Sequence, residues 1–309
     1  MNAAGDAIAV VDLAPWRSGH DPRTAAQLVD SFRRTGFAYL TGHGVPPDLV
    51  ASVFAAARDF FNQDPAQLDA VHQRHANNYR GYVPGRVIPG VGSLHDEIFD
   101  CGIELPPTYR GPGEVMRNTR NLWPAALPGF RPVVERYQAA VRRLADELLS
   151  AIAVGLTLPA DFFRVRCAEP HAQLRLLHYR PRPDAPDDAL SAGRHSDYEA
   201  ITILAQDDVG GLQVRDPSGA WVDVAPRENA FVINAGDLLT RWTNGAIPAT
   251  PHRVRTPRDR DRYSVAFFYG TSYDVLIEPA LPPATGDGQR YEPITTGEYL
   301  YRRYVETGA

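Results

Sequence analysis

The chain has 309 residues, of which 44% are hydrophobic and 22% charged, a composition typical of globular proteins. All 32 residues of the Lys+Arg count are arginines, which excludes chemistry that needs a lysine amine, such as Schiff-base formation. A net charge of -5 offers no basic field for nucleic acid, and no apolar run is long enough for a membrane span. With two cysteines and no charged leader, we expect a cytoplasmic monomer or weak homo-oligomer with neither nucleic-acid nor membrane partners.

The N-terminal half alternates between strand and helix patterns. Apolar residues at helical spacing predict helices over 25–34, 47–61 and 130–156, and short β-type runs predict strands over 8–13 and 37–41. No Ser/Gly linker or repeat marks a domain boundary.

From about residue 172 the chain becomes a series of short apolar runs separated by Gly and Pro turns, a pattern typical of an all-β barrel or sandwich. The runs cover 174–179, 200–206, 212–215, 221–224, 230–234, 252–254 and 263–269. We therefore predict an α+β, mostly β fold. A helical or mixed region over 1–165 packs on a β core over 166–309, and the two form one compact unit.

Two histidines and one aspartate in the β-rich half form a candidate metal site. Alternate residues of an extended strand share a face, so His195 and Asp197 are expected to project together, with Ser196 pointing away. His252 opens a later β run. Two imidazoles and one carboxylate, without thiolate, are the facial triad of non-haem Fe(II) oxygenases.

A third motif follows ten residues after His252. Arg262 and Ser264 share one face of an apolar run, and Phe268 continues that face. A guanidinium beside a hydroxyl in an apolar pocket suits a ligand carboxylate. Because an inward arginine must be paired, this pattern favours a carboxylate-binding role over a surface ion pair.

These motifs resemble the Fe(II)/2-oxoglutarate-dependent dioxygenases of the isopenicillin N synthase-like family. The matching stretches are HSDYEAITIL, GGLQV, AFVINAGDLLTRWTNG, TPHRV and RYSVAFF, in the order and spacing of the family. GFAYLTGHGVP, NNYRGYVP, DEIFDCGIELP and ITTGEYLYRRY extend the resemblance over nearly the whole chain. It implies a double-stranded β-helix (jelly-roll, cupin-like) barrel with a helical N-terminal region and a closing C-terminal helix.

The resemblance also implies roles for individual residues and cofactors. His195, Asp197 and His252 would be the catalytic iron ligands, and Arg262 and Ser264, with Tyr179, would bind the distal carboxylate of 2-oxoglutarate. The cofactor set is Fe(II), 2-oxoglutarate and O2, with ascorbate considered as an activator. Leu177 stands where many plant members have asparagine, a departure that bears on the contacts of the cosubstrate.

The expected reaction is oxidation of a C–H bond in a small-molecule metabolite, by hydroxylation, with release of succinate and CO2. A desaturase or oxidative cyclase, an oxidase or ethylene-forming relative, and a non-catalytic binding module remain alternatives. The candidate substrate-binding residues are Tyr79, Arg80, Tyr82, Arg86 and Phe268. If Arg80 or Arg86 faces the iron, the substrate is expected to carry a carboxylate. Asn234 and Gln213 are interpreted as structural residues of the barrel.

Overall fold

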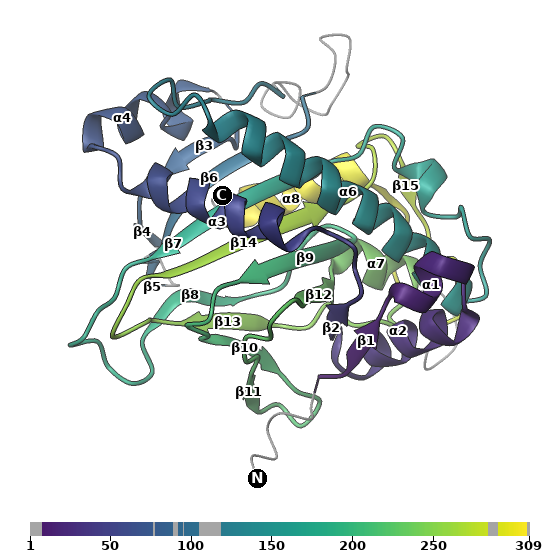
Figure 1. The fold of residues 1–309 in the computed structure, drawn as a ribbon. Helices are drawn as coiled ribbons and strands as arrows, with labels where there is room; N and C mark the ends of the chain where they lie inside the picture. The colour runs from purple at the N-terminus through teal and green to yellow at the C-terminus, as the bar shows by residue number, and fades with distance from the viewer. Residues whose placement is uncertain are drawn as a thin grey trace.

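Two β-sheets face each other in this protein, and helices cover the outer side of the larger sheet (Figure 1). The computed structural model describes residues 8–76, 78–88, 92–94, 96–104, 119–283 and 290–307. The model describes only the backbone of residue 307 and of the described residues from 86 to 96.

The larger sheet has eight strands in the order β1-β2-β12-β9-β14-β7-β6-β3. Only β1 and β2 pair in parallel among these neighbours; the other pairs are antiparallel. The N-terminal strands thus complete a sheet built mainly by the C-terminal half. The strands are β1 (Val10–Asp12), β2 (Phe37–Thr41), β12 (Phe231–Ala235), β9 (Ile201–Gln206), β14 (Arg262–Tyr269), β7 (Ala172–Tyr179), β6 (Asp96–Gly102) and β3 (Gly81–Val83).

The smaller sheet has four strands in the order β11-β10-β13-β8. They are β11 (Trp221–Asp223), β10 (Leu212–Arg215), β13 (His252–Arg255) and β8 (Leu190–His195). Two hairpin-like pairs complete the β structure, namely β4 (Arg86–Ile88) with β5 (Gly92–Leu94), and β15 (Leu276–Ile277) with β16 (Ile294–Thr295).

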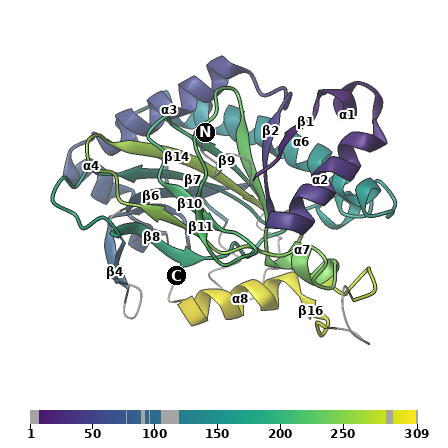
Figure 2. The same ribbon diagram turned by 90° about the horizontal axis from the view of Figure 1, so that it is seen from below.

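Helix α6 (Phe130–Gly155) lies across the larger sheet with α2 (Pro22–Thr35) and α3 (Pro47–Phe61) beside it (Figure 1). Helix α2 begins where the Asp21 carboxylate accepts from the Arg23 amide and ends at Gly36, whose φ of 70° suits glycine. The remaining helices are α1 (Ala14–Gly19), α4 (Pro65–Ala70), α7 (Asp237–Trp242) and α8 (Thr296–Thr307), with 3-10 turns at Gln73–His75 and Arg164–Arg166. The C-terminal helix α8 runs along the same side of the molecule as α7 and β16 (Figure 2).

Strand β7 shows how the two sides of the larger sheet differ. Leu174 and Leu176 pack into the cluster shared with the helices, whereas Leu177 and Tyr179 belong to a second cluster that also holds Val214 of the smaller sheet. The inward face of the larger sheet is therefore the face turned toward the smaller one.

The predicted helices and most predicted strands are confirmed within a few residues at their ends. Sequence patterns missed β8, the short helices α1, α4 and α7, and the strands β3 to β6. None of the helices that the structure describes combines the length and apolar character that crossing a membrane requires.

Candidate active site

His195 and His252 are direct partners across two neighbouring strands. His195 ends β8 and His252 begins β13, and the antiparallel register pairs them with ring centroids 4.2 Å apart. The ring of Phe37 lies edge-on against His252 at 5.5 Å. Both imidazoles are thus positioned by the smaller sheet.

Asp197 lies in the loop after β8, so it does not share a strand with His195 as the sequence pattern predicted. The start of α7 holds this loop, because the Asp237 amide donates to the Asp197 carbonyl over 2.9 Å. A side chain at Gly236 would lie 2.1 Å from the Glu199 carbonyl oxygen, so only glycine permits this approach. The position of Asp197 beside the histidines thus depends on the contact of this loop with the start of α7, not on alternation along β8.

Two donors hold one carboxylate oxygen of the buried Asp197. Thr202 Oγ1 and Asn234 Nδ2 donate to Asp197 Oδ2 over 2.5 and 2.7 Å. Burial alone would raise the pKa of Asp197, but the two imidazoles and these hydrogen bonds favour the carboxylate, and its pKa is lowered overall. The other oxygen, Oδ1, lies 3.6 Å from His252 Nε2 and 4.0 Å from His195 Nε2. Asn234, interpreted from sequence as structural, positions this candidate ligand.

Each imidazole has its Nδ1 against a main-chain carbonyl. The distances are 2.8 Å from His195 Nδ1 to the Gly193 oxygen and 3.2 Å from His252 Nδ1 to the Thr250 oxygen. A ring nitrogen beside a carbonyl carries the proton, which leaves each Nε2 with a lone pair. Although 45% of the His195 side chain is exposed, desolvation by the surrounding protein and the facing His252 lower the pKa of His195 to about 4. His195 is therefore neutral at neutral pH.

These three residues offer one ligand atom each, and those atoms lie within 4.8 Å of one another. Two lone-pair nitrogens and one carboxylate oxygen suit Fe(II) by donor type. The residues present therefore fit the metal that the motif predicted.

Arg262 is almost fully buried, at 1% exposure, on the inward face of β14. Its Nε donates to the Gly210 carbonyl over 2.5 Å, and its NH1 donates to Ser264 Oγ over 3.4 Å. The guanidinium carbon lies 4.6 Å from the centroid of the Tyr179 ring. Throughout the described part of the chain, no acidic side chain forms an ion pair with Arg262. Burial raises the pKa of Asp207 and the charge of Arg262 acts against that rise, but the hydrogen-bond partners of Arg262 are neutral. A buried cation hydrogen-bonded only to neutral groups is suited to an anionic ligand.

Leu177, which stands where many plant members have asparagine, lies beside Arg262 and Ser264. It pairs with Ser264 across β7 and β14, and Tyr179 pairs with Arg262 two residues along. Leu177 therefore places an apolar side chain beside the hydroxyl of Ser264.

The five candidate substrate residues lie in different places. Phe268 is on the inward face of β14, and the ring of Tyr79 packs at a tilt against Tyr304 of α8, with centroids 4.6 Å apart. Tyr82 packs toward the helices and donates to Glu97 over 2.7 Å. Arg80 donates to oxygens of Thr119, Asn121 and Ile103. The side chain of Arg86 lies outside the described residues.

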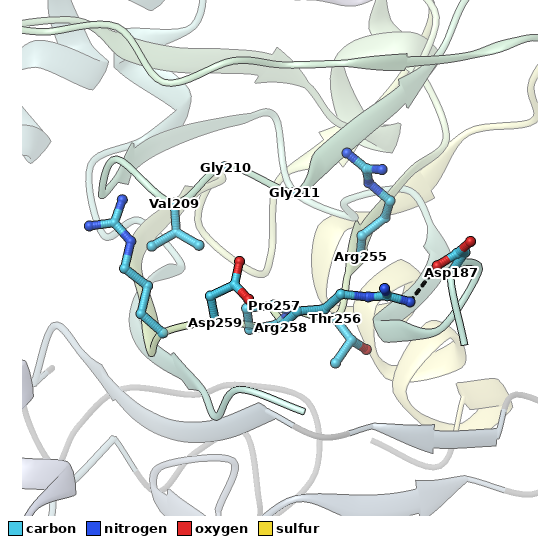
Figure 3. A pocket seen from close by; sticks show the side chains of 10 residues that line it. Asp187, Val209, Gly210, Gly211, Arg255, Thr256, Pro257, Arg258 and Asp259 are labelled. Carbon is cyan, nitrogen blue, oxygen red and sulfur yellow. Dashed lines mark hydrogen bonds and ion pairs between the residues drawn. The ribbon is translucent and has the colours of Figure 1, made fainter. Parts of the chain in front are cut away.

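Gly210, whose carbonyl accepts from Arg262, also lines a cavity of about 650 Å³ (Figure 3). Its arginines are paired with acids, Arg258 with Asp187 as drawn, and Arg260 with Asp208. None of the three candidate metal ligands lines it. This cavity is therefore separate from the metal site.

Comparison with known proteins agrees with this geometry. Residues 170–271 match the 2OG-Fe(II) oxygenase superfamily, and residues 8–126 match the N-terminal region of a non-haem dioxygenase in morphine synthesis. The chain is 31% identical to homoarginine-6-hydroxylase 2-ODD-233 of Oryza sativa subsp. japonica, over 99% of this chain and 98% of the relative. It is 35% identical to the 2-oxoglutarate-dependent dioxygenase citB of Monascus ruber, over 96% and 94%.

A solved structure is similar over the full length. A Neurospora crassa protein, crystallised as the full-length chain in complex with alpha-KG and thymine, superposes with a TM-score of 0.88 at 30% identity, covering 99% of both chains. The chain therefore belongs to the 2OG-Fe(II) oxygenase superfamily, as an enzyme that uses Fe(II), 2-oxoglutarate and O2 to oxidise C–H bonds of small metabolites.

Proposed function

We propose that His195, Asp197 and His252 hold the catalytic Fe(II). The observation that carries this proposal is the gathering of their three ligand atoms within 4.8 Å, from β8, the following loop and β13. Thr202 and Asn234 keep the carboxylate turned so that Oδ1 is the oxygen nearest both Nε2 atoms. When bound, the metal with 2-oxoglutarate and O2 supplies the oxidising power, with succinate and CO2 as coproducts.

Arg262, with Ser264 and Tyr179, binds the distal carboxylate of 2-oxoglutarate in this proposal. The charges support it, since Fe(II) and Asp197 together carry about one positive charge, Arg262 adds about one more, and the 2-oxoglutarate dianion balances them. The Gly210 carbonyl and the Tyr179 ring fix the guanidinium before the ligand arrives. Leu177 helps to exclude water from this end of the site.

The two facing sheets form a double-stranded β-helix in this proposal, and regions 1–165 and 166–309 act as one unit. Support comes from β1 and β2, which join the larger sheet, and from the core shared by α3, α6, β7 and β14. The two buried free cysteines support a reducing compartment such as the cytoplasm, where the enzyme acts as a monomer or weak homo-oligomer in specialised metabolism.

The prime substrate is a small polar metabolite, and the reaction is hydroxylation. Relatives are named for homoarginine hydroxylation and clavatol oxidation, and one solved relative holds thymine. Phe268 and Tyr79 are the predicted contacts best supported by their position. Arg80, Tyr82 and Arg86 remain predictions.

A metabolite screen under ¹⁸O₂ tests the proposed reaction. Hydroxylation predicts one succinate per O2 consumed and one labelled oxygen in the product. Loss of two hydrogens without label would identify a desaturase or cyclase instead. Turnover without succinate would identify an oxidase or an ethylene-forming relative, and a protein that binds neither Fe(II) nor 2-oxoglutarate would be a non-catalytic module.

A further inference from the structure

One row of cross-strand partners leads away from the proposed metal site along the inward face of the larger sheet. Asn234 pairs with Thr202, Thr202 with Phe268, and Phe268 with Gln173. Since paired residues share a face, all four side chains point inward. The first two hold Asp197, so Phe268 and Gln173 are the next side chains beyond the metal carboxylate.

Gln173 carries a side-chain amide on this inward face. The residue is 8% exposed, and its amide makes no hydrogen bond within the residues that the structure describes. Neither end of the amide is a fully buried group without a partner, so both ends are accessible to a small molecule on this face. Its carbonyl can accept one hydrogen bond while its NH2 donates another.

An arginine lies two residues further along the same strand face, but its charge is already balanced. Arg175 makes a bidentate pair with the buried Asp100 through distances of 2.8 and 2.9 Å. Its guanidinium lies 5.6 Å from the centroid of the Phe268 ring. Arg175 therefore borders Phe268 as half of a neutral pair.

Two further described groups beside this face, Arg80 and Tyr304, are occupied or uncharged. Arg80 packs against Gly102, the partner of Gln173 on β6, and its guanidinium donates to backbone and amide oxygens. Burial raises the pKa of Tyr304 on α8, which keeps its hydroxyl neutral, and Arg175 and Asp100 both act on that pKa.

We propose that Gln173, Phe268 and the Arg175–Asp100 pair form the recognition surface for the prime substrate, and that this surface selects an uncharged amide-type group: a carboxamide, lactam or cyclic imide. The N–H and C=O of such a group pair with the two ends of the Gln173 amide, and its plane packs on the Phe268 ring. A carboxylate has no hydrogen to donate to the Gln173 carbonyl, and the charge of Arg175 beside Phe268 is already balanced by Asp100. This inference rests on the proposed metal site, because the row begins at Asn234 and Thr202, which hold Asp197.

The test compares matched ligands that differ only in this group. Nicotinamide with nicotinate, and benzamide with benzoate, are titrated into the anaerobic Fe(II)–2-oxoglutarate complex by calorimetry. In the wild type, the amide member of a pair binds at least about tenfold more tightly, the effect of one buried group left unpaired. Gln173→Leu removes that preference, and Asp100→Asn, which frees Arg175, turns it toward the carboxylate member.

Controls separate this inference from the proposed function. Gln173→Glu keeps the shape of the side chain and should weaken both members of each pair, so the test stands even if Asp100→Asn does not fold. Titration of 2-oxoglutarate alone into each variant, with its melting temperature, checks that the rest of the site is intact. Two outcomes with normal 2-oxoglutarate binding would refute the recognition surface and leave the oxygenase assignment standing. In the first, the carboxylate members bind as tightly as the amides. In the second, no member of either pair binds. Failure to bind 2-oxoglutarate in the wild type would refute the proposed function, and with it this inference.

Discussion

The hydrogen bonds to Asp197 Oδ2 give a direct test of how the metal site is positioned. Thr202→Val keeps the shape of the side chain and removes the 2.5 Å hydrogen bond, and Asn234→Leu removes the 2.7 Å one. A hydrogen bond to a charged group contributes about 1.5–3 kcal/mol. When one of these donors is removed, the Asp197 carboxylate loses one of the two contacts that turn Oδ1 toward the histidines. Groups that orient metal ligands typically change metal affinity by about 10- to 100-fold, and we expect a loss in that range for each variant.

Calorimetric titration with Fe(II) under anaerobic conditions measures this loss, and thermal melting without metal separates it from a folding defect. Gln213→Leu is the matched control. Gln213 is also a buried amide, but it contacts Asp223 and Arg253 on the smaller sheet rather than a ligand. Wild-type metal affinity in both Thr202→Val and Asn234→Leu, or an equal loss in Gln213→Leu, would refute the reasoning.

Three further perturbations test the cosubstrate site, the thiols and the core. Arg262→Ala should weaken 2-oxoglutarate binding by about 2–5 kcal/mol, measured by anaerobic calorimetry. Arg260→Ala, in the exposed loop, is the control and should leave that binding unchanged. Equal 2-oxoglutarate affinities in the two variants would contradict the assignment. Burial raises the pKa of Cys167 to about 12 and that of Cys101 further. Both thiols should therefore stay protonated at pH 8 and should not react with a thiol reagent until the protein unfolds. Rapid labelling of the native protein would disprove this. Phe267→Ala empties a fully buried core position and should lower the free energy of unfolding by about 3–5 kcal/mol in chemical denaturation, and a loss below about 1 kcal/mol would show a more adaptable core.

Local patterns were enough to predict the candidate ligands and the buried arginine, but not the contacts that position them. His252 and Arg262 stand at the beginning of apolar runs, and alternation along such a run gives the face of each side chain. Asp197 reached the predicted place by a different route, in a loop held by α7 and by Thr202 and Asn234. Those contacts depend on strand register across the sheet, which the sequence alone does not determine.

The substrate side was harder to predict for the same reason. Tyr82 and Arg80 are close in sequence to motif residues, yet their hydroxyl and guanidinium groups bind Glu97 and backbone oxygens. Gln173 and Arg175 lie in an ordinary-looking β run, and only the pairing of β7 with β14 places them beside Phe268. The signal in the sequence was the presence of polar residues at inward positions of an apolar strand, as with Asn234, because such groups need partners.

The most direct test of the central claim is an anaerobic titration of the Fe(II)-loaded protein with 2-oxoglutarate, followed by visible absorption. If His195, Asp197 and His252 hold the metal and Arg262 holds the far carboxylate, a weak charge-transfer band appears and saturates with 2-oxoglutarate. The same account predicts no band in Asp197→Ala, and saturation only at much higher 2-oxoglutarate in Arg262→Ala. A wild-type protein without the band, or an Asp197→Ala variant that keeps it unchanged, would contradict the account.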